Sequence, residues 1–263
     1  MAPKEFTIYQ VDAFAEEVFE GNPAAVIPLT EWLPDDVLQS IAAENNLSET
    51  AYFIDQGDHY HLRWFTPAKE VRLCGHATLA SAHVLFEHLG FEQEEITFKA
   101  LGGTLKVRKQ GMLLTMDFPA DRFQESDDAK LVMEALGIPI LDIVRGTDDI
   151  LVRIDSEAQL QSLEPDFAAI AKLPYRGVIV TAPGTETDVA SRGFYPNYGI
   201  DEDPVTGSAH TLLTPYWSKL LEQETFSAVQ GSKRKGYLRC TSKGDRVEIS
   251  GPAKTYLKGI IFV

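Results

Sequence analysis

The sequence predicts an α+β protein built from two pseudo-repeated lobes, each with strands around one central apolar helix. Three observations support this. The chain has 263 residues, which is long for one core and suits two lobes of roughly 100–150 residues each. Short apolar or alternating runs dominate both halves. Each half also contains one apolar helix that starts with glycine, a small or polar residue and alanine: Gly75-His76-Ala77 and Gly207-Ser208-Ala209.

The first half alternates strands with two helices. Residues 34–46, PDDVLQSIAAENN, have acidic residues in the first turn and apolar residues at helical spacing. Residues 75–90, GHATLASAHVLFEHLG, are apolar on nearly every side, which predicts a buried helix. Strand patterns, punctuated by Gly, Asp and Asn, cover 6–14, 24–29, 50–55, 59–65, 96–100, 103–109 and 112–120.

The second half follows the same plan. Helical patterns at 127–137 and 164–174 precede strands at 177–183 and 188–196. The second apolar helix, GSAHTLLTPYWSKLL, begins at Gly207, and we expect Pro215 to kink or end it. Four further strand patterns close the chain, at 226–230, 237–241, 246–250 and 256–263.

Composition limits the class of protein. The formal net charge of −15 repels phosphate backbones and anionic lipid, so we expect neither a nucleic-acid nor a membrane partner. The start of the chain lacks the apolar stretch of a signal peptide, and no apolar run approaches the roughly 18 residues that span a bilayer, so we expect a cytoplasmic protein. Only Cys74 and Cys240 are cysteines, and neither they nor the histidines form a metal-ligand set, so no metal is expected.

Glu49, in NNLSETAYF, is the first candidate for chemistry. A glutamate in such a position is as a rule an exposed carboxylate at the start of a strand. Here it lies between the end of a helix and a clearly apolar strand. Carboxyl groups held near apolar surface have raised pKa values, which suits general acid/base catalysis near neutral pH.

His76 is the second candidate. A lone histidine on an apolar helix is most often a core residue with its hydrogen bonds satisfied. At the first turn of a buried helix, the positive end of the helix dipole favours the neutral imidazole, which can donate or accept one hydrogen bond at a reacting group. The free N–H groups of Gly75, His76 and Ala77 could hold a carboxylate.

Asp203, in DEDPVTGSAH, is the third candidate. An aspartate before a proline also fits an acidic turn that caps a helix. In the functional interpretation Asp203 lies at the mouth of the second apolar helix, where Gly207 and Ser208 offer N–H and hydroxyl groups to an anionic end of a ligand. Titratable groups in unlike environments can then take separate acid and base roles.

Four segments in this order and spacing resemble the PhzF-like isomerases, a family named after phenazine biosynthesis and placed in the diaminopimelate epimerase-like superfamily. They are GNPAAV (21–26), NLSETAYF (46–53), CGHATLA (74–80) and EDPVTGSA (202–209). The resemblance runs from about the first strand to the last. It implies lobes in which a strongly curved, mostly antiparallel sheet or barrel wraps a central helix, with the active site between the lobes.

The resemblance also implies roles. Glu49 would be the proton shuttle, assisted by His76 and Asp203. The substrate would be bound by Asn22, Gly75, Ala77, Gly207 and Ser208. No cofactor and no metal would be used, and the substrate would be a small carboxylate-bearing metabolite on which a proton moves between carbons. Homodimers are common in the family, so we expect a homodimer.

Two alternatives stay open: an amino- or hydroxy-acid racemase or dehydratase, and a catalytically silent interaction protein on the same fold. Epimerases of the superfamily that use two thiols carry one cysteine at each helix mouth. Cys74 fits the first position, but Thr206 occupies the second, so we interpret Cys74 as a small buried residue.

The lobes are expected at residues 1–120, completed by a last strand at about 255–263, and at residues 121–254.

Overall fold

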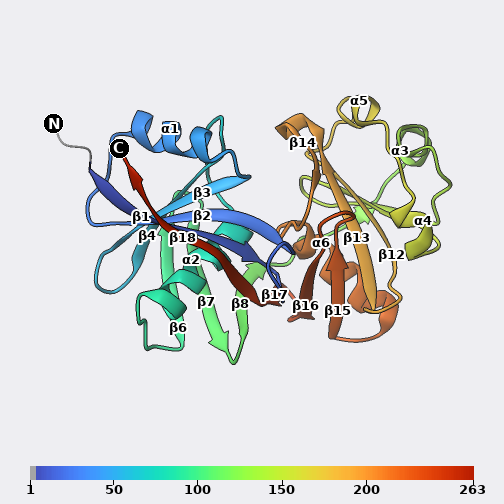
Figure 1. Cartoon of the computed structure of the whole chain (residues 1–263). Helices are drawn as coiled ribbons and strands as arrows, with labels where there is room; N and C mark the ends of the chain where they lie inside the picture. Colours follow the sequence, from blue (N-terminus) through green and yellow to red (C-terminus); the bar gives the residue numbers. More distant parts are fainter. Residues whose placement is uncertain (1–3) are drawn as a thin grey trace. The chain divides into compact units, whose positions relative to one another are not determined.

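The computed structural model describes residues 4–263 and divides into two compact units (Figure 1). Among the described residues, unit 1 comprises 4–117 and Ser250–Val263, and unit 2 comprises Phe118–Ile249. The predicted α+β class is confirmed: strands dominate each unit and enclose or carry a few helices. Among residues 4–263, no helix is long and apolar enough to cross a membrane.

Unit 1 is a curved sheet around helix α2 (Gly75–His88). Its first strand, β1 (Glu5–Ala13), pairs antiparallel with β18 (Ala253–Phe262) and with β2 (Asn22–Leu29). The order continues through β3 (Glu49–Asp55) and β4 (Tyr60–Phe65). Strands β6 (Glu95–Ala100), β7 (Gly103–Gln110), β8 (Leu113–Pro119) and the short β5 (Glu70–Val71) complete it.

Helix α2 packs against β1, β2, β3 and β18 inside this sheet (Figure 1). Its small residues make that close approach possible, and the hydroxyls buried in it bond to carbonyls one turn back: Thr78 Oγ1 to Cys74 O at 2.5 Å and Ser81 Oγ to Ala77 O at 2.7 Å. Helix α1 (Asp35–Asn45) covers the outer side, where Ile27, Leu38 and Tyr52 join one buried cluster.

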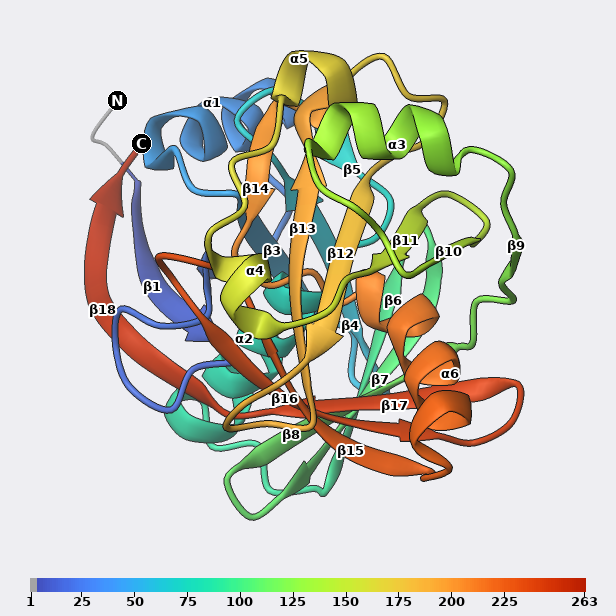
Figure 2. The same ribbon diagram turned by 90° about the vertical axis from the view of Figure 1, so that its right-hand side faces the viewer.

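Unit 2 contains a central run of strands with helices on both faces (Figure 2). Strand β11 (Ile150–Arg153) pairs parallel with β12 (Val178–Pro183), which pairs antiparallel with β13 (Val189–Tyr195). Strands β9 (Gln124–Glu125) and β10 (Asp142–Arg145) extend the β11 side. Strands β14 (Ile200–Asp203), β15 (Thr225–Gln230) and β16 (Gly236–Ser242) extend the β13 side. Strand β17 is Arg246–Gly251.

The helices of unit 2 occupy opposite sides of β12. Val178 and Val180 face a buried cluster that includes residues of α3 (Ala129–Leu136), α4 (Glu157–Gln161) and α5 (Phe167–Ile170). Thr181 follows Val180 and so faces the other side of the strand, where it accepts a 2.9 Å hydrogen bond from Trp217 Nε1 of α6 (Ala209–Leu221). A short 3₁₀ turn, η1 (Pro196–Tyr198), follows β13.

Helix α6 continues through Pro215 to Leu221, so the proline does not end it, and a kink at Pro215 stays a prediction. Proline removes the amide that would bond the carbonyl oxygen of Thr211. That oxygen instead accepts a 3.0 Å hydrogen bond from the backbone N–H of Asp121. A neighbouring segment of the same unit therefore compensates for the lost bond.

Candidate functional site

Glu49 and His76 form a buried pair in unit 1. Glu49 is the first residue of β3, reached from α1 through Asn46, whose φ of 49° is left-handed and ends the helix. His76 lies in the first turn of α2. The distance from His76 Nε2 to Glu49 Oε2 is 3.2 Å, and the side chains are only 7% and 13% exposed. Two of the predicted site residues are therefore brought together.

The start of α2 supplies backbone donors beside this pair. Cys74 precedes the helix in an extended conformation (φ −147°, ψ 112°), and its side chain makes no capping hydrogen bond. The first intrahelical bond runs from Thr78 N to Cys74 O, so the N–H groups of Gly75, His76 and Ala77 have no carbonyl of an earlier turn to bind. Such a helix start attracts an anion.

The protonation of His76 differs from the sequence-based expectation of a neutral ring. Burial disfavours the imidazolium, but the charge of the Glu49 carboxylate favours it, as does the Cys74 sulfur when it is ionised, and the pKa of His76 is raised well above its ordinary value. The carboxylate at 3.2 Å outweighs the helix dipole. His76 can therefore carry a proton at neutral pH and donate it towards Glu49 or a ligand.

Cys74 is the third member of this cluster. The sequence did not predict that its thiol lies against the His76 ring. Its Sγ lies 3.5 Å from His76 Nδ1. Burial, and next the charge of Glu49, raise the pKa of the Cys74 thiol to about 11, so it is protonated at neutral pH. A protonated, buried thiol is a poor nucleophile.

Glu49, Cys74 and His76 are also of the types that bind metal ions, and one possible ligand atom of each lies within 4.8 Å of the other two. However, Nδ1 of His76 faces the thiol while Nε2 faces the carboxylate. One ion can use only one of these nitrogens. The imidazole therefore lies between the thiol and the carboxylate, an arrangement that suits contact with both better than shared ligation of one ion.

Asn22 lies next to this cluster, at the start of β2. It is fully buried, and its Oδ1 is 3.5 Å from the hydroxyl of Ser48. Strands β2 and β3 run parallel with Ala24 opposite Glu49. The parallel register thus brings the start of β2 and the start of β3 to the same end of the sheet.

Asp203 belongs to a separate network in unit 2. It ends β14, and its Oδ2 accepts a 2.6 Å hydrogen bond from the hydroxyl of Thr206. That hydroxyl oxygen in turn accepts from Nε2 of Gln230, at 2.9 Å, and Gln230 Oε1 accepts from the Thr206 backbone N–H at 3.0 Å. Thr206, where a two-thiol enzyme would carry cysteine, therefore fixes the orientation of the Asp203 carboxylate.

Gly207 and Ser208 lead into α6. Among residues 4–263, no acceptor is found for the backbone N–H of either residue, because the first bonds of this helix are donated by Ala209, His210 and Thr211. The Ser208 hydroxyl accepts a 3.0 Å hydrogen bond from Arg176. As in unit 1, glycine and a polar residue present unpaired donors at a helix start.

Arg176, Asp149 and Gln230 were not identified from the sequence. Arg176 and Asp149 form a forked ion pair, with Nε to Oδ1 at 2.8 Å and Nη2 to Oδ2. Burial raises the pKa of Asp149 although the Arg176 charge opposes this. The hydrophobic periodicity of the sequence does not identify these residues as part of a site, because their hydrogen-bond partners lie more than twenty residues away in the chain. Only Arg176 has a local signal, since its charge stands directly before an apolar strand in YRGVIV.

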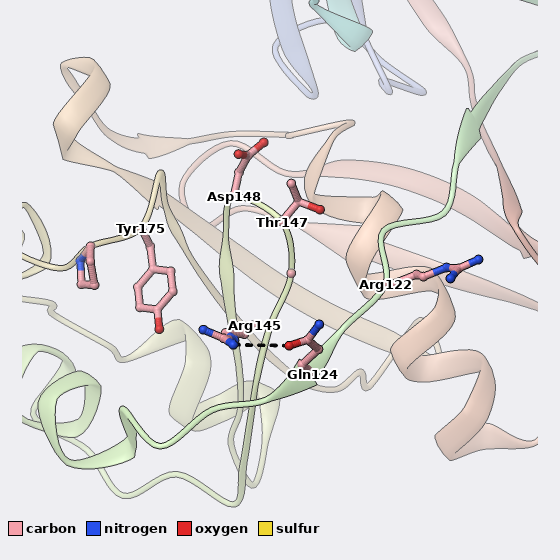
Figure 3. A pocket seen from close by; sticks show the side chains of 8 residues that line it. Arg122, Gln124, Arg145, Thr147, Asp148 and Tyr175 are labelled. Atoms are coloured by element: carbon pink, nitrogen blue, oxygen red, sulfur yellow. Dashed lines mark hydrogen bonds between the residues drawn. The ribbon is translucent and has the colours of Figure 1, made fainter.

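An open hollow on unit 2 contains none of the predicted site residues. Figure 3 shows it, with Arg145 donating a 3.3 Å hydrogen bond to Gln124. Its volume is about 390 Å³, and it is lined by Arg122, Gln124, Arg145, Gly146, Thr147, Asp148, Pro174 and Tyr175. Its arginines are exposed, so it lacks the desolvation of the two helix mouths.

Comparison with known proteins gives one family. The family model described as phenazine biosynthesis-like protein matches residues 11–259. An uncharacterized isomerase of Pseudomonas aeruginosa is 51% identical over 257 residues, covering 98% of this chain and 99% of the relative. The crystal structure of a PhzF-family phenazine biosynthesis protein from Enterococcus faecalis superposes with a TM-score of 0.96 at 46% identity, covering 99% of this chain and 100% of that one.

A more distant likeness concerns the fold alone. A hydroxyproline epimerase from Agrobacterium vitis, crystallised with trans-4-hydroxy-L-proline, has a TM-score of 0.59 at 11% identity, covering 100% of this chain and 94% of its own. This likeness shows that the two proteins share a fold.

Proposed function

The chain belongs to the PhzC-PhzF family of phenazine biosynthesis-like proteins and is an isomerase, and from this premise we propose that it moves a proton on a small carboxylate-bearing metabolite by cofactor-independent general acid/base catalysis. The observation that carries the proposal is the Glu49–His76 pair: a carboxylate 3.2 Å from an imidazole, both largely buried, at the start of a buried helix.

Glu49 is the proton shuttle in this proposal. Its carboxylate takes a proton from a carbon next to an activating group, and the electron pair of the C–H bond is delocalised into that group. The protonated Glu49 then returns the proton, either to a second carbon, which gives isomerisation, or to the same carbon, which gives epimerisation if the face differs. Nothing is oxidised or reduced, so side chains alone balance the reaction.

The other residues hold and polarise the substrate. His76, whose pKa is raised, donates a hydrogen bond where negative charge develops, and Asp203, oriented by Thr206, assists. The N–H groups of Gly75, Ala77, Gly207 and Ser208, together with Asn22, bind the polar and carboxylate groups of the same substrate. We further propose that the enzyme acts as a cytoplasmic homodimer without nucleic-acid or membrane partners.

A racemase that uses paired thiolates is less well supported. Thr206 stands in place of a second cysteine and is engaged with Asp203. The pKa of Cys74, raised to about 11, leaves little thiolate at neutral pH. A silent interaction protein would not need the buried Glu49–His76 pair, which is costly to bury without function.

The test is solvent-deuterium incorporation. The protein is incubated in D₂O with a panel of amino acids, hydroxyprolines, hydroxy acids and cyclic unsaturated carboxylates, and mass gain is followed by mass spectrometry and proton NMR. We expect exchange into at least one class. Glu49→Gln should reduce its rate by about 10²–10⁴-fold, because glutamine keeps the shape but cannot exchange a proton. His76→Ala and Asp203→Asn should lose less.

Glu44→Gln is the matched control, since Glu44 is exposed on α1 in the same unit. It should exchange at the wild-type rate. A Glu49→Gln protein that exchanges as fast as the wild type would remove Glu49 as the shuttle. A wild-type protein that binds carboxylates but exchanges none of the panel would favour the interaction protein instead.

A further inference from the structure

A half-buried arginine contacts the hydroxyl at the start of α6. Arg176 lies just before β12, and its guanidinium makes hydrogen bonds to two partners. Nε and Nη2 fork onto the Asp149 carboxylate, and Nη2 also donates to Ser208 Oγ at 3.0 Å. The ring of Tyr195 lies 5.6 Å from the guanidinium carbon, within the range of a cation–π interaction.

The ion pair has a rigid support. Asp149 is only 3% exposed and lies directly before β11, which runs parallel to β12. The backbone links the two segments twice more, with Arg176 N donating to Asp148 O at 2.8 Å and Ile150 N donating to Gly177 O at 3.1 Å. A forked carboxylate on such a frame leaves the guanidinium little freedom to turn.

This contact determines the direction of the Ser208 hydroxyl proton. Arginine has donors and no acceptor, so Ser208 Oγ must accept from Arg176 and cannot donate back. Ser208 makes no side-chain capping bond to α6. Its proton therefore remains available to another acceptor, beside the unpaired N–H groups of Gly207 and Ser208.

We propose that Arg176, held by Asp149, is a positioning residue that presents the Ser208 hydroxyl to a carboxylate bound at the start of α6. The proposal rests on the proposed function only in taking Ser208 as part of the carboxylate site. Arg176 acts through Ser208 and does not touch the substrate. Lysine at this position has one nitrogen and cannot both fork onto Asp149 and donate to Ser208 in the same geometry.

Acetate, the simplest relevant carboxylate, is the probe. It is titrated into ¹⁵N-labelled full-length protein at constant ionic strength, and the amide resonances of Gly207 and Ser208 report binding. We expect Arg176→Lys and Ser208→Ala each to raise the Kd by about tenfold or more, the scale of one hydrogen bond to a charged group. The double variant should be no weaker than Ser208→Ala, because both changes remove the same interaction. Asp149→Asn should weaken binding in the same direction.

Arg63→Lys is the matched control. Arg63 forks onto Glu70 in unit 1 at 2.7 and 2.8 Å and makes no hydrogen bond to a predicted site residue, so its variant should bind acetate as the wild type does. A wild-type Kd for Arg176→Lys, losses that add in the double variant, or acetate that leaves both amides unshifted would each overturn the proposal. Melting curves confirm that each variant is folded.

This test is independent of proton transfer. Acetate binding is read from the amide resonances of Gly207 and Ser208 and requires no deuterium exchange with any substrate. If the Arg176 and Ser208 variants bind acetate like the wild type and the wild type still exchanges deuterium, the positioning role of Arg176 is refuted and the isomerase mechanism is not. If these variants weaken acetate binding as expected but the wild type exchanges deuterium with no substrate, the isomerase mechanism is refuted and the carboxylate site is not.

Discussion

Because of His210, the free energy of unfolding should decrease as the pH falls below neutral. It lies in the first turn of α6, is 0% exposed, and its Nδ1 is 2.9 Å from the carbonyl oxygen of Thr206. Burial lowers the pKa of His210 to about 4, although the hydrogen bond to Thr206 opposes this. The folded protein therefore keeps His210 neutral at pH values where the unfolded chain protonates it.

The sign and size follow from linkage. Above about pH 6.5 both states are neutral at this position and the contribution is constant. Between about 6.5 and about 4 the unfolded state binds the proton and the folded state does not, so the free energy of unfolding falls by up to about 1.4 kcal/mol per pH unit. The loss attributable to His210 is about 2 kcal/mol from about pH 7.5 to about pH 5.

The assay compares the wild type with His210→Asn, whose amide can still donate to the Thr206 carbonyl. Urea unfolding is followed through tryptophan fluorescence, since the buried Trp217 lies on the same helix. His76 works in the opposite direction, because its raised pKa stabilises the fold at low pH. It is present in both proteins, so the difference between them isolates His210.

We expect the difference in the free energy of unfolding between the wild type and His210→Asn to change by about 2 kcal/mol, to the disadvantage of the wild type, as the pH falls from about 7.5 to about 5. A difference that stays constant within about 0.5 kcal/mol would refute a buried neutral His210.

Four other substitutions have defined outcomes. Cys74→Ser should leave deuterium exchange within about an order of magnitude of the wild type; a loss like that of the glutamate variant would make the thiol catalytic. Pro215→Ala should change unfolding free energy by less than about 1 kcal/mol in urea titrations, because the Thr211 carbonyl already has a donor. Gly21→Ala should cost at least about 2 kcal/mol, since φ is +62° and its Cβ would lie 2.0 Å from a backbone oxygen, whereas Gly57→Ala (φ +88°), with nothing within 4 Å, should cost about 1 kcal/mol.

The sequence predicted the long elements because their patterns are local. The helix expected at 75–90 is α2, Gly75–His88, and the second apolar helix is α6, Ala209–Leu221. The strands β5, β9, β10, β11 and β14 and the helix α4 were missed. They have two to five residues, too few for an alternation or a helical period to show. Their pairing partners, not their own residues, determine them.

The candidate site divides in the same way. Glu49, His76 and Asp203 stand in motifs whose flanking residues mark them, and the structure places Glu49 against His76. The charge of the pair was not foreseeable. The helix dipole, a local feature, favours a neutral His76, whereas the carboxylate that opposes it comes from β3 and is close only in the folded chain.

The two helix mouths share a plan and differ in chemistry. At the start of α2 the side chains are titratable: His76 lies between a thiol and a carboxylate, with Nδ1 3.5 Å from Cys74 Sγ and Nε2 3.2 Å from Glu49 Oε2. At α6 the hydrogen bonds run in one fixed direction, from Gln230 through Thr206 to Asp203, and from Arg176 to Ser208. Amide and guanidinium groups hold their protons at every physiological pH, so this network orients its acceptors without exchanging protons.

If the starts of both helices serve one substrate, as we propose, proton transfer takes place at α2 and the substrate carboxylate is bound at α6. Substitutions in the Glu49–His76 chain should then lower kcat, and substitutions in the Arg176–Ser208 chain should raise KM. An Arg176→Lys enzyme with reduced kcat and unchanged KM would contradict this division.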